Sequence, residues 1–141
     1  MVYLLDVSAL IALGFINHEF HDRVANWAQP RRPAGAASLH FATCSITELG
    51  FVRVLSQAPA YGFTVAQART LLLRLKRSRG SLFGFIPDAH DVSYLPGWAR
   101  WPKQVTDAHL AKLANANGAV LATLDETIPG SFLIPRSHVG S

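Results

Sequence analysis

Short runs of apolar residues alternate along this chain with longer segments in which apolar residues recur every three or four positions. Continuous apolar runs of roughly four to eight residues are typical of buried strands, and the wider spacing is typical of amphipathic helices. The pattern predicts strands over residues 2–5, 39–43, 81–86 and 119–124. It predicts helices over residues 9–13, 19–29, 46–57, 65–78 and 104–117.

The order of these elements indicates the fold class. Strands that alternate with helices are typical of an α/β protein, and we expect a three-layer α/β/α sandwich around a mainly parallel sheet. The stretch 31–38, with Pro33 and Gly35, is predicted to be a loop, and Gly118 is expected to end the helix before it. A chain of 141 residues, half of them apolar, can bury the core of one domain, so residues 1–141 are predicted to form a single domain.

Four acidic residues stand at the predicted junctions between strands and helices. They are Asp6, Glu48, Asp107 and Asp125, in a chain with only nine Asp and Glu in total. Ligands of open α/β sheets bind beyond the carboxyl ends of the strands, where Asp6 and Asp125 are expected. A group of carboxylates at that edge is suited to hold a hard cation such as Mg²⁺ against a phosphate substrate.

Each acid also has a structural interpretation. Asp6 or Ser8 could cap the first helix, and Asp107 could interact with the dipole of its own helix. The segment from Ser45 to Glu48 matches the S-x-x-E capping box, in which the glutamate bonds back to the amide of the capping residue. Asp125 could belong to an ordinary turn after a strand. Capping gives no reason for four acids to meet at one sheet edge, so the set favours a cation site.

The charge distribution points to an anionic partner. The net charge is +4, and no acid occurs between Glu48 and Asp88. Basic residues crowd one part of that interval, namely Arg69, Arg74, Lys76, Arg77 and Arg79. Nucleic acid is the obvious candidate for such a field. The alternative is a solvated helix face opposite a buried side made of Leu71, Leu72, Leu73 and Leu75.

Several basic residues are candidate contacts to a nucleic-acid substrate. They are Arg53, Arg74, Arg77, Arg100 and Lys103. Arg53 could equally form a surface or interface salt bridge. The segment from Trp98 to Lys103 interleaves aromatic and basic residues, which could stack bases and hold phosphates. Covering the core or forming a dimer contact is an equally good interpretation of Trp98 and Trp101.

Other features exclude protein classes or leave a role open. No apolar run is long enough to cross a bilayer and the N-terminus lacks the features of a signal peptide, so we expect a soluble cytoplasmic protein. The lone Cys44 is expected to be a small core residue. The segment His18-Glu19-Phe20-His21-Asp22 lacks the second histidine of a zinc motif, because Asp22 stands in its place. Roles for His21, Asp88 and Asp91 stay open.

Four segments together resemble the motifs of one nuclease family. They are Leu4-Leu5-Asp6-Val7-Ser8-Ala9-Leu10, Thr47-Glu48-Leu49-Gly50-Phe51-Val52-Arg53, Val105-Thr106-Asp107-Ala108-His109-Leu110-Ala111 and Leu121-Ala122-Thr123-Leu124-Asp125. In this order they resemble the PIN-domain nucleases, above all the VapC toxins of bacterial toxin–antitoxin pairs.

The resemblance implies an activity, a cofactor and partners. It implies an endoribonuclease that depends on Mg²⁺ or Mn²⁺, is usually dimeric and is neutralised by a small VapB-type antitoxin. On this chain the metal-site and catalytic acids would be Asp6, Glu48, Asp107 and Asp125, with Ser8 and Thr123 in the positions of supporting hydroxyl residues. A PIN-like domain that only binds RNA, without catalysis or toxicity, is the alternative. A phosphorylated receiver or a phosphatase is disfavoured, because Asp6-Val7-Ser8 lacks the second aspartate of a D-x-D phosphatase motif.

Overall fold

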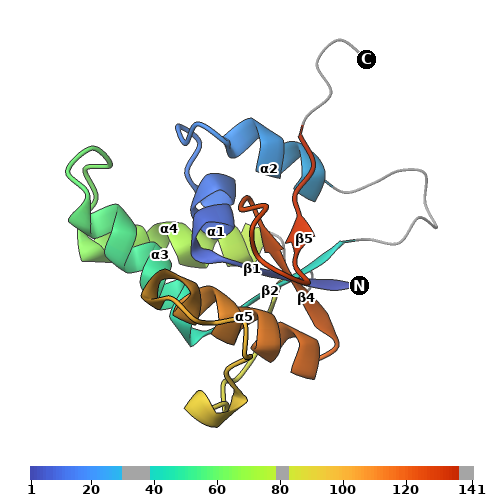
Figure 1. The fold of residues 1–141 in the computed structure, drawn as a ribbon. Helices are drawn as coiled ribbons and strands as arrows, with labels where there is room; N and C mark the ends of the chain where they lie inside the picture. Colours follow the sequence, from blue (N-terminus) through green and yellow to red (C-terminus); the bar gives the residue numbers. More distant parts are fainter. Residues whose placement is uncertain (30–38, 79–82, 137–141) are drawn as a thin grey trace.

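The structure, a computed structural model, describes residues 1–29, 39–78 and 83–136 (Figure 1). The strands are β1 (Val2–Leu5), β2 (His40–Thr43), β3 (Phe83–Phe85), β4 (Ala119–Thr123) and β5 (Phe132–Leu133). The helices are α1 (Val7–Gly14), α2 (His21–Ala28), α3 (Ser45–Gln57), α4 (Val65–Ser78) and α5 (Val105–Ala116). Single turns of 3-10 helix lie at Val92–Tyr94 and Pro102–Gln104.

All strand pairs in the described sheet are parallel, in the order β3-β2-β1-β4-β5. The chain runs from β1 outward to β2 and β3, and then returns to β4 on the other side of β1. The order in which the chain adds strands therefore reverses between β1 and β4. Ligands of doubly wound sheets bind at the carboxyl ends of the strands beside such a point. The predicted parallel sheet is confirmed. Strand β5 was not predicted, because two residues are too few to give a periodic pattern.

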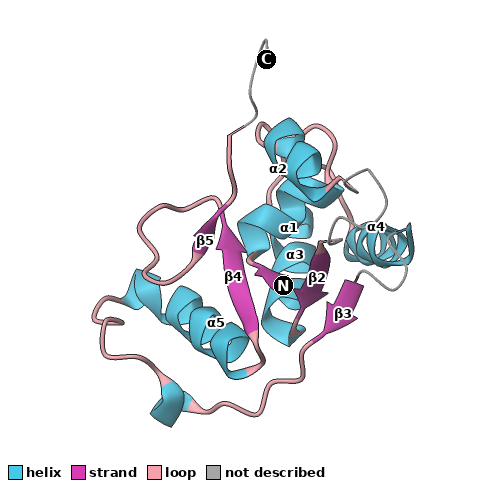
Figure 2. Cartoon of the chain, turned by 90° about the vertical axis from the view of Figure 1, so that its right-hand side faces the viewer, coloured by secondary structure: helices cyan, strands magenta, loops and turns pink. Residues whose placement is uncertain are grey.

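Successive residues of the central strands face opposite sides of the sheet, and this alternation builds two cores. Leu5, Phe41 and Ala122 pack with buried residues of α1, α2, α3 and α4. Leu4, Ala42 and Leu121 pack with α5 on the other face. In Figure 2, α5 alone lies on one side of the sheet, while α1, α2 and α4 lie on the other. The structure thus confirms the predicted three-layer α/β/α arrangement.

Several predicted boundaries differ from those in the structure. Helix α1 begins at Val7 and continues to Gly14, beyond the predicted 9–13. Helix α2 begins at His21 and not at residue 19. Leu73, expected on the buried side of α4, is 48% exposed, because the apolar stripe is narrower than the leucine run. The predicted loop 31–38 and the first residues of the strand predicted over 81–86 lie outside the described residues.

Two further expectations can be compared with the structure. Gly118 has φ of +69°, a left-handed conformation that glycine adopts without strain, and it follows α5 as predicted. Cys44 is fully buried in the core beneath α5, which agrees with its expected packing role. In the part of the chain that the structure describes, no helix has the length and apolar character needed to cross a membrane.

The contact between α1 and α3 depends on a glycine. A Cβ atom added at Gly50 would lie 2.5 Å from Cγ2 of Val7. We therefore expect Gly50→Ala to lower the free energy of unfolding by about 1 kcal/mol or more, because overpacking outweighs the gain in helix propensity. Adding Val7→Ala should restore most of the loss. Denaturant unfolding provides the measurement, with Gly97→Ala as control, since a Cβ there meets no atom within 4 Å. Equal stability of both glycine variants would contradict the close helix contact.

Candidate functional site

Three of the four predicted acids line one cavity at the carboxyl edge of the sheet. Asp6 follows β1, Asp125 lies shortly after β4, and Asp107 stands in the first turn of α5, the helix that leads into β4. The cavity has a volume of about 960 Å³, and Ser8 and Thr123 also line it. It lies at the carboxyl ends of β1 and β4, the two strands between which the strand order reverses. The fold therefore brings together acids that are up to 119 positions apart in the chain.

Thr123 connects two of these acids. Its Oγ1 donates to Oδ2 of Asp6 over 2.5 Å and accepts from the backbone N–H of Asp125 over 3.0 Å. The other oxygen of Asp6, Oδ1, accepts from the backbone N–H of Ala9 over 2.8 Å, so Asp6 also caps α1. Asp6 therefore serves as a helix cap and as a wall of the cavity. These bonds fix its carboxylate from two sides.

The environment of Asp125 differs from that of Asp6. Its Oδ1 accepts from both Oγ1 and the backbone N–H of Thr127, over 2.7 and 2.9 Å. These two bonds lower the pKa of Asp125, and the positive charge of Lys103 lowers it further. Because both bonds go to Oδ1, Oδ2 is the oxygen that remains for a further ligand. Asp125 is therefore a preoriented carboxylate that stays ionised.

Burial and mutual repulsion act on the other two acids. Asp6 is only 6% exposed, and burial raises its pKa to about 6 despite the bonds from Thr123 and Ala9. The negative charges of Asp107 and Asp125 add to the rise. Burial also raises the pKa of Asp107, with a contribution from Asp125. The cavity thus concentrates negative charge that a bound cation would relieve.

The donor set fits a hard divalent cation. Carboxylate oxygens are the ligands that Mg²⁺ and Mn²⁺ prefer, and Mg²⁺ keeps several waters while binding one or two carboxylates. Among the described residues, no three or more His, Cys, Asp or Glu side chains are grouped so that they could hold a metal ion together. Two carboxylates with retained water would be enough for Mg²⁺. Asp6, Asp107 and Asp125 therefore have the chemistry of a water-rich cation site.

Glu48, the fourth predicted acid, is held apart from this group. Its Oε2 accepts from Oγ1 of Thr43 over 2.6 Å and from Nζ of Lys76 over 2.5 Å. Nζ of Lys76 also lies 5.6 Å from the centre of the Phe85 ring. Glu48 is not among the described residues that line the cavity of Asp6. The structure thus brings three of the four acids together and pairs the fourth with a lysine.

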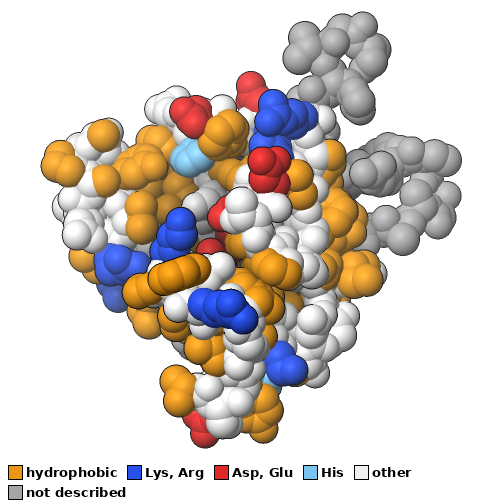
Figure 3. Space-filling view, viewed as in Figure 1, with side chains coloured by type: hydrophobic (Ala, Val, Ile, Leu, Met, Phe, Trp, Pro, Cys, Tyr) orange, Lys and Arg blue, Asp and Glu red, His pale blue; other side chains and the backbone are white. Residues whose placement is uncertain are grey.

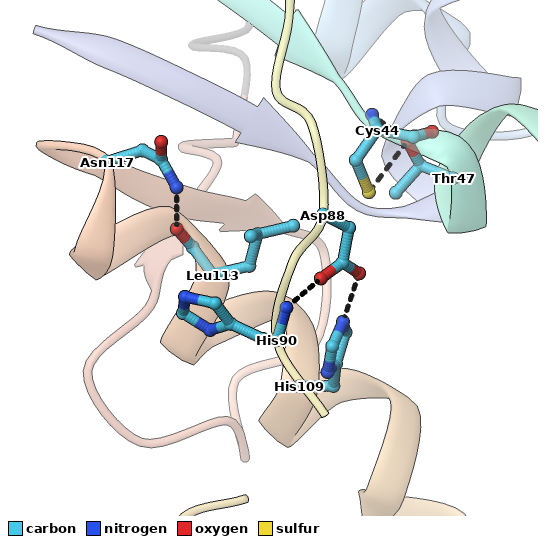
Figure 4. A network of polar contacts seen from close by, with 7 residues as sticks. All are labelled: Cys44, Thr47, Asp88, His90, His109, Leu113 and Asn117. Atoms are coloured by element: carbon cyan, nitrogen blue, oxygen red, sulfur yellow. Dashed lines mark hydrogen bonds and ion pairs between the residues drawn. The ribbon is translucent and has the colours of Figure 1, made fainter. Parts of the chain in front are cut away.

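The capping-box interpretation of Glu48 is wrong. Helix α3 begins at Ser45, and the residue that caps it is Cys44, one position earlier than expected. Thr47 takes the place of the predicted glutamate, since its Oγ1 accepts from the backbone N–H of Cys44 over 3.0 Å (Figure 4). The side chain of Glu48 is therefore not engaged by the start of its own helix.

The candidate substrate contacts occupy several places. Lys103 lies near Asp125, and its charge acts on that acid. Arg74 and Arg77 line a shallow hollow on α4, and Arg53 is exposed on α3. Arg100 is exposed in the loop before α5. Of these residues, only Lys103 acts on an acid of the cavity. Arg79 lies outside the described residues.

Four aromatic residues of the cavity wall were not predicted from the sequence. Phe15, Phe20, Tyr61 and Phe63 line it from the loop after α1 and the loop between α3 and α4. Phe15 packs edge-on against both Tyr61 and Phe63, with ring centres 5.2 and 5.6 Å apart. Loop residues follow no periodic pattern, so their meeting could not be inferred. Thr127, two residues after Asp125, was detectable as an Asx-type turn.

The residues whose roles stayed open form local polar contacts away from the cavity. Asp88 Oδ2 contacts Nε2 of His109, and Asp88 Oδ1 accepts from the backbone N–H of His90 (Figure 4). Asp91 caps the short helix at 92–94. Nδ1 of His21 lies 2.7 Å from the carbonyl oxygen of Ala12. These contacts shape the loops around α5 and the start of α2.

The raised pKa of Asp6 leads to a prediction about metal-free protein. The folded state binds the Asp6 proton more tightly than the unfolded state does. Asp6 therefore lowers the free energy of unfolding above pH 6, where it is ionised, and does not lower it below pH 4, where it is protonated. Asp6→Asn keeps a good N-cap but carries no charge. Its free energy of unfolding should match the wild type near pH 3.5 and exceed it by up to about 3 kcal/mol above pH 7. Denaturant unfolding in EDTA across this range measures the difference. If the difference in free energy of unfolding between the wild type and Asp6→Asn is the same at every pH, burial does not destabilise the ionised Asp6.

Comparison with known proteins gives the family. No protein-family model matches the chain. Similar proteins from Mycobacterium tuberculosis include Ribonuclease VapC38, which is 37% identical over 86% of this chain and 84% of its own, and Ribonuclease VapC44, which is 38% identical over 89% and 87%. The crystal structure of VapBC2 from Rickettsia felis bound to a promoter DNA fragment contains a chain that superposes with a TM-score of 0.56. That chain is 16% identical to this one, and the match covers 94% of this chain and 97% of that one, which shows a shared fold. The chain belongs to the VapC ribonucleases, a family of PIN-domain nucleases.

Proposed function

We propose that this protein is an endoribonuclease that depends on Mg²⁺ or Mn²⁺ and acts as the toxin of a VapBC-type toxin–antitoxin pair. The observation that carries the proposal is the meeting of Asp6, Asp107 and Asp125 in one cavity, with the pKa of buried Asp6 raised to about 6. Three similar proteins named Ribonuclease VapC support the choice of RNA as substrate.

Asp6, Asp107 and Asp125 would hold the cation, one or two of them directly and the rest through its retained waters. When bound there, a divalent cation polarises a scissile phosphate and lowers the pKa of a water molecule. The protein supplies the orientation. Thr123 fixes Asp6, and Thr127 fixes Asp125 through one oxygen so that the other remains available. No nucleophilic side chain is required.

Basic side chains would hold the RNA backbone. Lys103 stands beside the acids, where it can contact a phosphate next to the reacting one. Arg74 and Arg77 are exposed on α4 and would contribute affinity independent of sequence, together with Arg53 and Arg100.

The proposed protein partner is a VapB-type antitoxin. The fold neighbour from Rickettsia felis is a VapBC2 assembly on promoter DNA, which supports a partner of this kind. A homodimer is also proposed, as is usual for the family that the sequence resembles. The second candidate function is a PIN-like domain that binds RNA without cutting it. The ion pair between Glu48 and Lys76 favours that alternative, because it keeps one acid away from the cation site.

Cleavage of RNA under controlled cation supply separates the two functions. Purified protein should cut single-stranded or looped RNA with Mg²⁺ or Mn²⁺, lose the activity in EDTA and regain it when the cation is returned. Asp107→Asn should reduce the rate at least about 100-fold, since it removes a charged ligand from the site. Analysis of cleaved ends on sequencing gels provides the measurement. Binding of RNA without cleavage at any cation concentration would favour the alternative.

Glu48 and Lys76 allow a test of the fourth acid. We propose that Glu48 leaves Lys76 to join the cation site. Glu48→Gln should then reduce the rise in melting temperature that Mn²⁺ produces, because a neutral amide is a poorer ligand. Lys76→Met should enlarge the rise, because the competing ammonium group is gone.

Both variants also lose the ion pair, so each is compared with and without Mn²⁺ by differential scanning fluorimetry. Arg77→Met, an exposed change on the same helix, is the matched control. A Mn²⁺-induced shift that is the same in Glu48→Gln, Lys76→Met and wild type would show that Glu48 serves only the ion pair.

A further inference from the structure

A second hollow adjoins the acid cavity. It has a volume of about 330 Å³, and Trp98, Trp101, Gln104 and Thr127 are among its walls. Asp107 and Asp125 line this hollow as well as the larger cavity. The two acids therefore stand between two spaces. Figure 3 shows acidic side chains recessed near the middle of this face, with Lys or Arg and hydrophobic side chains around them.

Trp101 presents an aromatic surface to solvent from a well-fixed loop. Its side chain is 64% exposed. The backbone N–H of Arg100 bonds to the carbonyl of Trp98, and that of Gln104 bonds to the carbonyl of Trp101, over 3.0 and 2.9 Å. Trp98 packs against the core cluster under α5 and anchors the start of the loop. An exposed aromatic ring held in this way loses little conformational freedom when a ligand stacks on it.

Gln104 adds a directional polar group. Its Oε1 accepts from the backbone N–H groups of Arg100 and Trp101, each over 3.1 Å. Two N–H donors on one side-chain atom identify that atom as the oxygen. The amide Nε2 therefore remains as a donor, and because Gln104 lines the hollow, this group can meet an acceptor on a ligand.

We propose that this hollow is a nucleobase subsite, in which Trp101 stacks on the base of a nucleotide adjacent to the scissile phosphate of an RNA strand. The inference rests on the proposed ribonuclease function. With the phosphate at Asp107 and Asp125, a neighbouring base reaches the hollow and the next phosphate reaches Lys103. Nε2 of Gln104 donates to a carbonyl oxygen or ring nitrogen on the edge of the base.

Charge and position favour a base over a segment of a protein partner. The hollow shares Asp107 and Asp125 with the acid cavity, so a ligand in it lies next to whatever occupies the cation site. Arg100 and Lys103 are exposed next to Trp101 and suit the phosphates on either side of a stacked base. A nucleic-acid strand supplies both an anion for these residues and an aromatic face for Trp101.

The test separates stacking from phosphate contacts. Binding is measured by fluorescence anisotropy in Mg²⁺, with all proteins carrying Asp107→Asn so that RNA stays intact. The probes are labelled oligouridylate of about 12 nucleotides, within the span of a single-strand groove, and a ribose–phosphate oligomer of equal length without bases. Trp101→Ala should weaken oligouridylate binding about tenfold and leave binding of the abasic oligomer unchanged. Trp101→Phe should restore most of the affinity.

Three controls complete the design. Tyr94→Ala removes another exposed aromatic residue, one that does not line the hollow, and should change neither affinity. Lys103→Met should weaken binding of both oligomers. Binding of oligouridylate should quench tryptophan fluorescence in the parent protein but much less in Trp101→Phe, a readout that a merely structural role would not change.

The outcomes distinguish this inference from the proposed function. Equal weakening of both oligomers by Trp101→Ala, or no effect on either, overturns the base subsite. An unchanged RNA affinity together with loss of antitoxin binding would overturn it too and assign Trp101 to a protein interface. If the wild type cuts no RNA while the tryptophan pattern is seen, the nuclease proposal fails and the base subsite stands.

Discussion

The buried carboxylate of Asp6 links the fold to the cavity. Placing an ionised group at 6% exposure is costly unless hydrogen bonds replace lost water. One bond comes from the first turn of α1 and the other from Thr123, which is 117 positions away along the chain. The same carboxylate therefore starts a helix, joins β1 to the end of β4 and forms part of the cavity wall. Its raised pKa shows that the two bonds do not fully offset burial.

Threonines at strand ends recur as partners of acids. Thr43 is the last residue of β2 and donates to Glu48, and Thr123 is the last residue of β4 and donates to Asp6. Both threonines are fully buried, so each hydroxyl must find an acceptor within the protein. A strand-terminal threonine thereby orients a carboxylate at the carboxyl edge of the sheet. In these contacts Asp6 accepts hydrogen bonds from neutral donors, whereas Glu48 is paired with the ammonium group of Lys76.

Periodicity revealed most of the fold, because it records which face each residue turns toward the core. Leu4 and Leu5 illustrate this, since they enter opposite cores on either side of one sheet. The same reasoning placed Asp6 and Asp125 at one edge, because parallel strands end together. It could not place Glu48, whose partner Lys76 lies 28 positions away on another helix. The capping motif beginning at Ser45 was misleading for a similar reason. The capping residue is the non-helical residue directly before the helix, and here that residue is Cys44.

Under the proposed function, the charge of the site makes cation and RNA binding interdependent. A basic protein attracts the RNA backbone over long distances, yet Asp6, Asp107 and Asp125 repel a phosphate that enters the cavity. A divalent cation would reverse the local field, so RNA would bind more tightly to the loaded site. By linkage, RNA would raise the affinity for the cation by the same factor. The hollow beside Trp101 would act in the same direction, because stacking of a base supplies affinity that does not depend on charge. The strand would then be held by its base as well as by its phosphate.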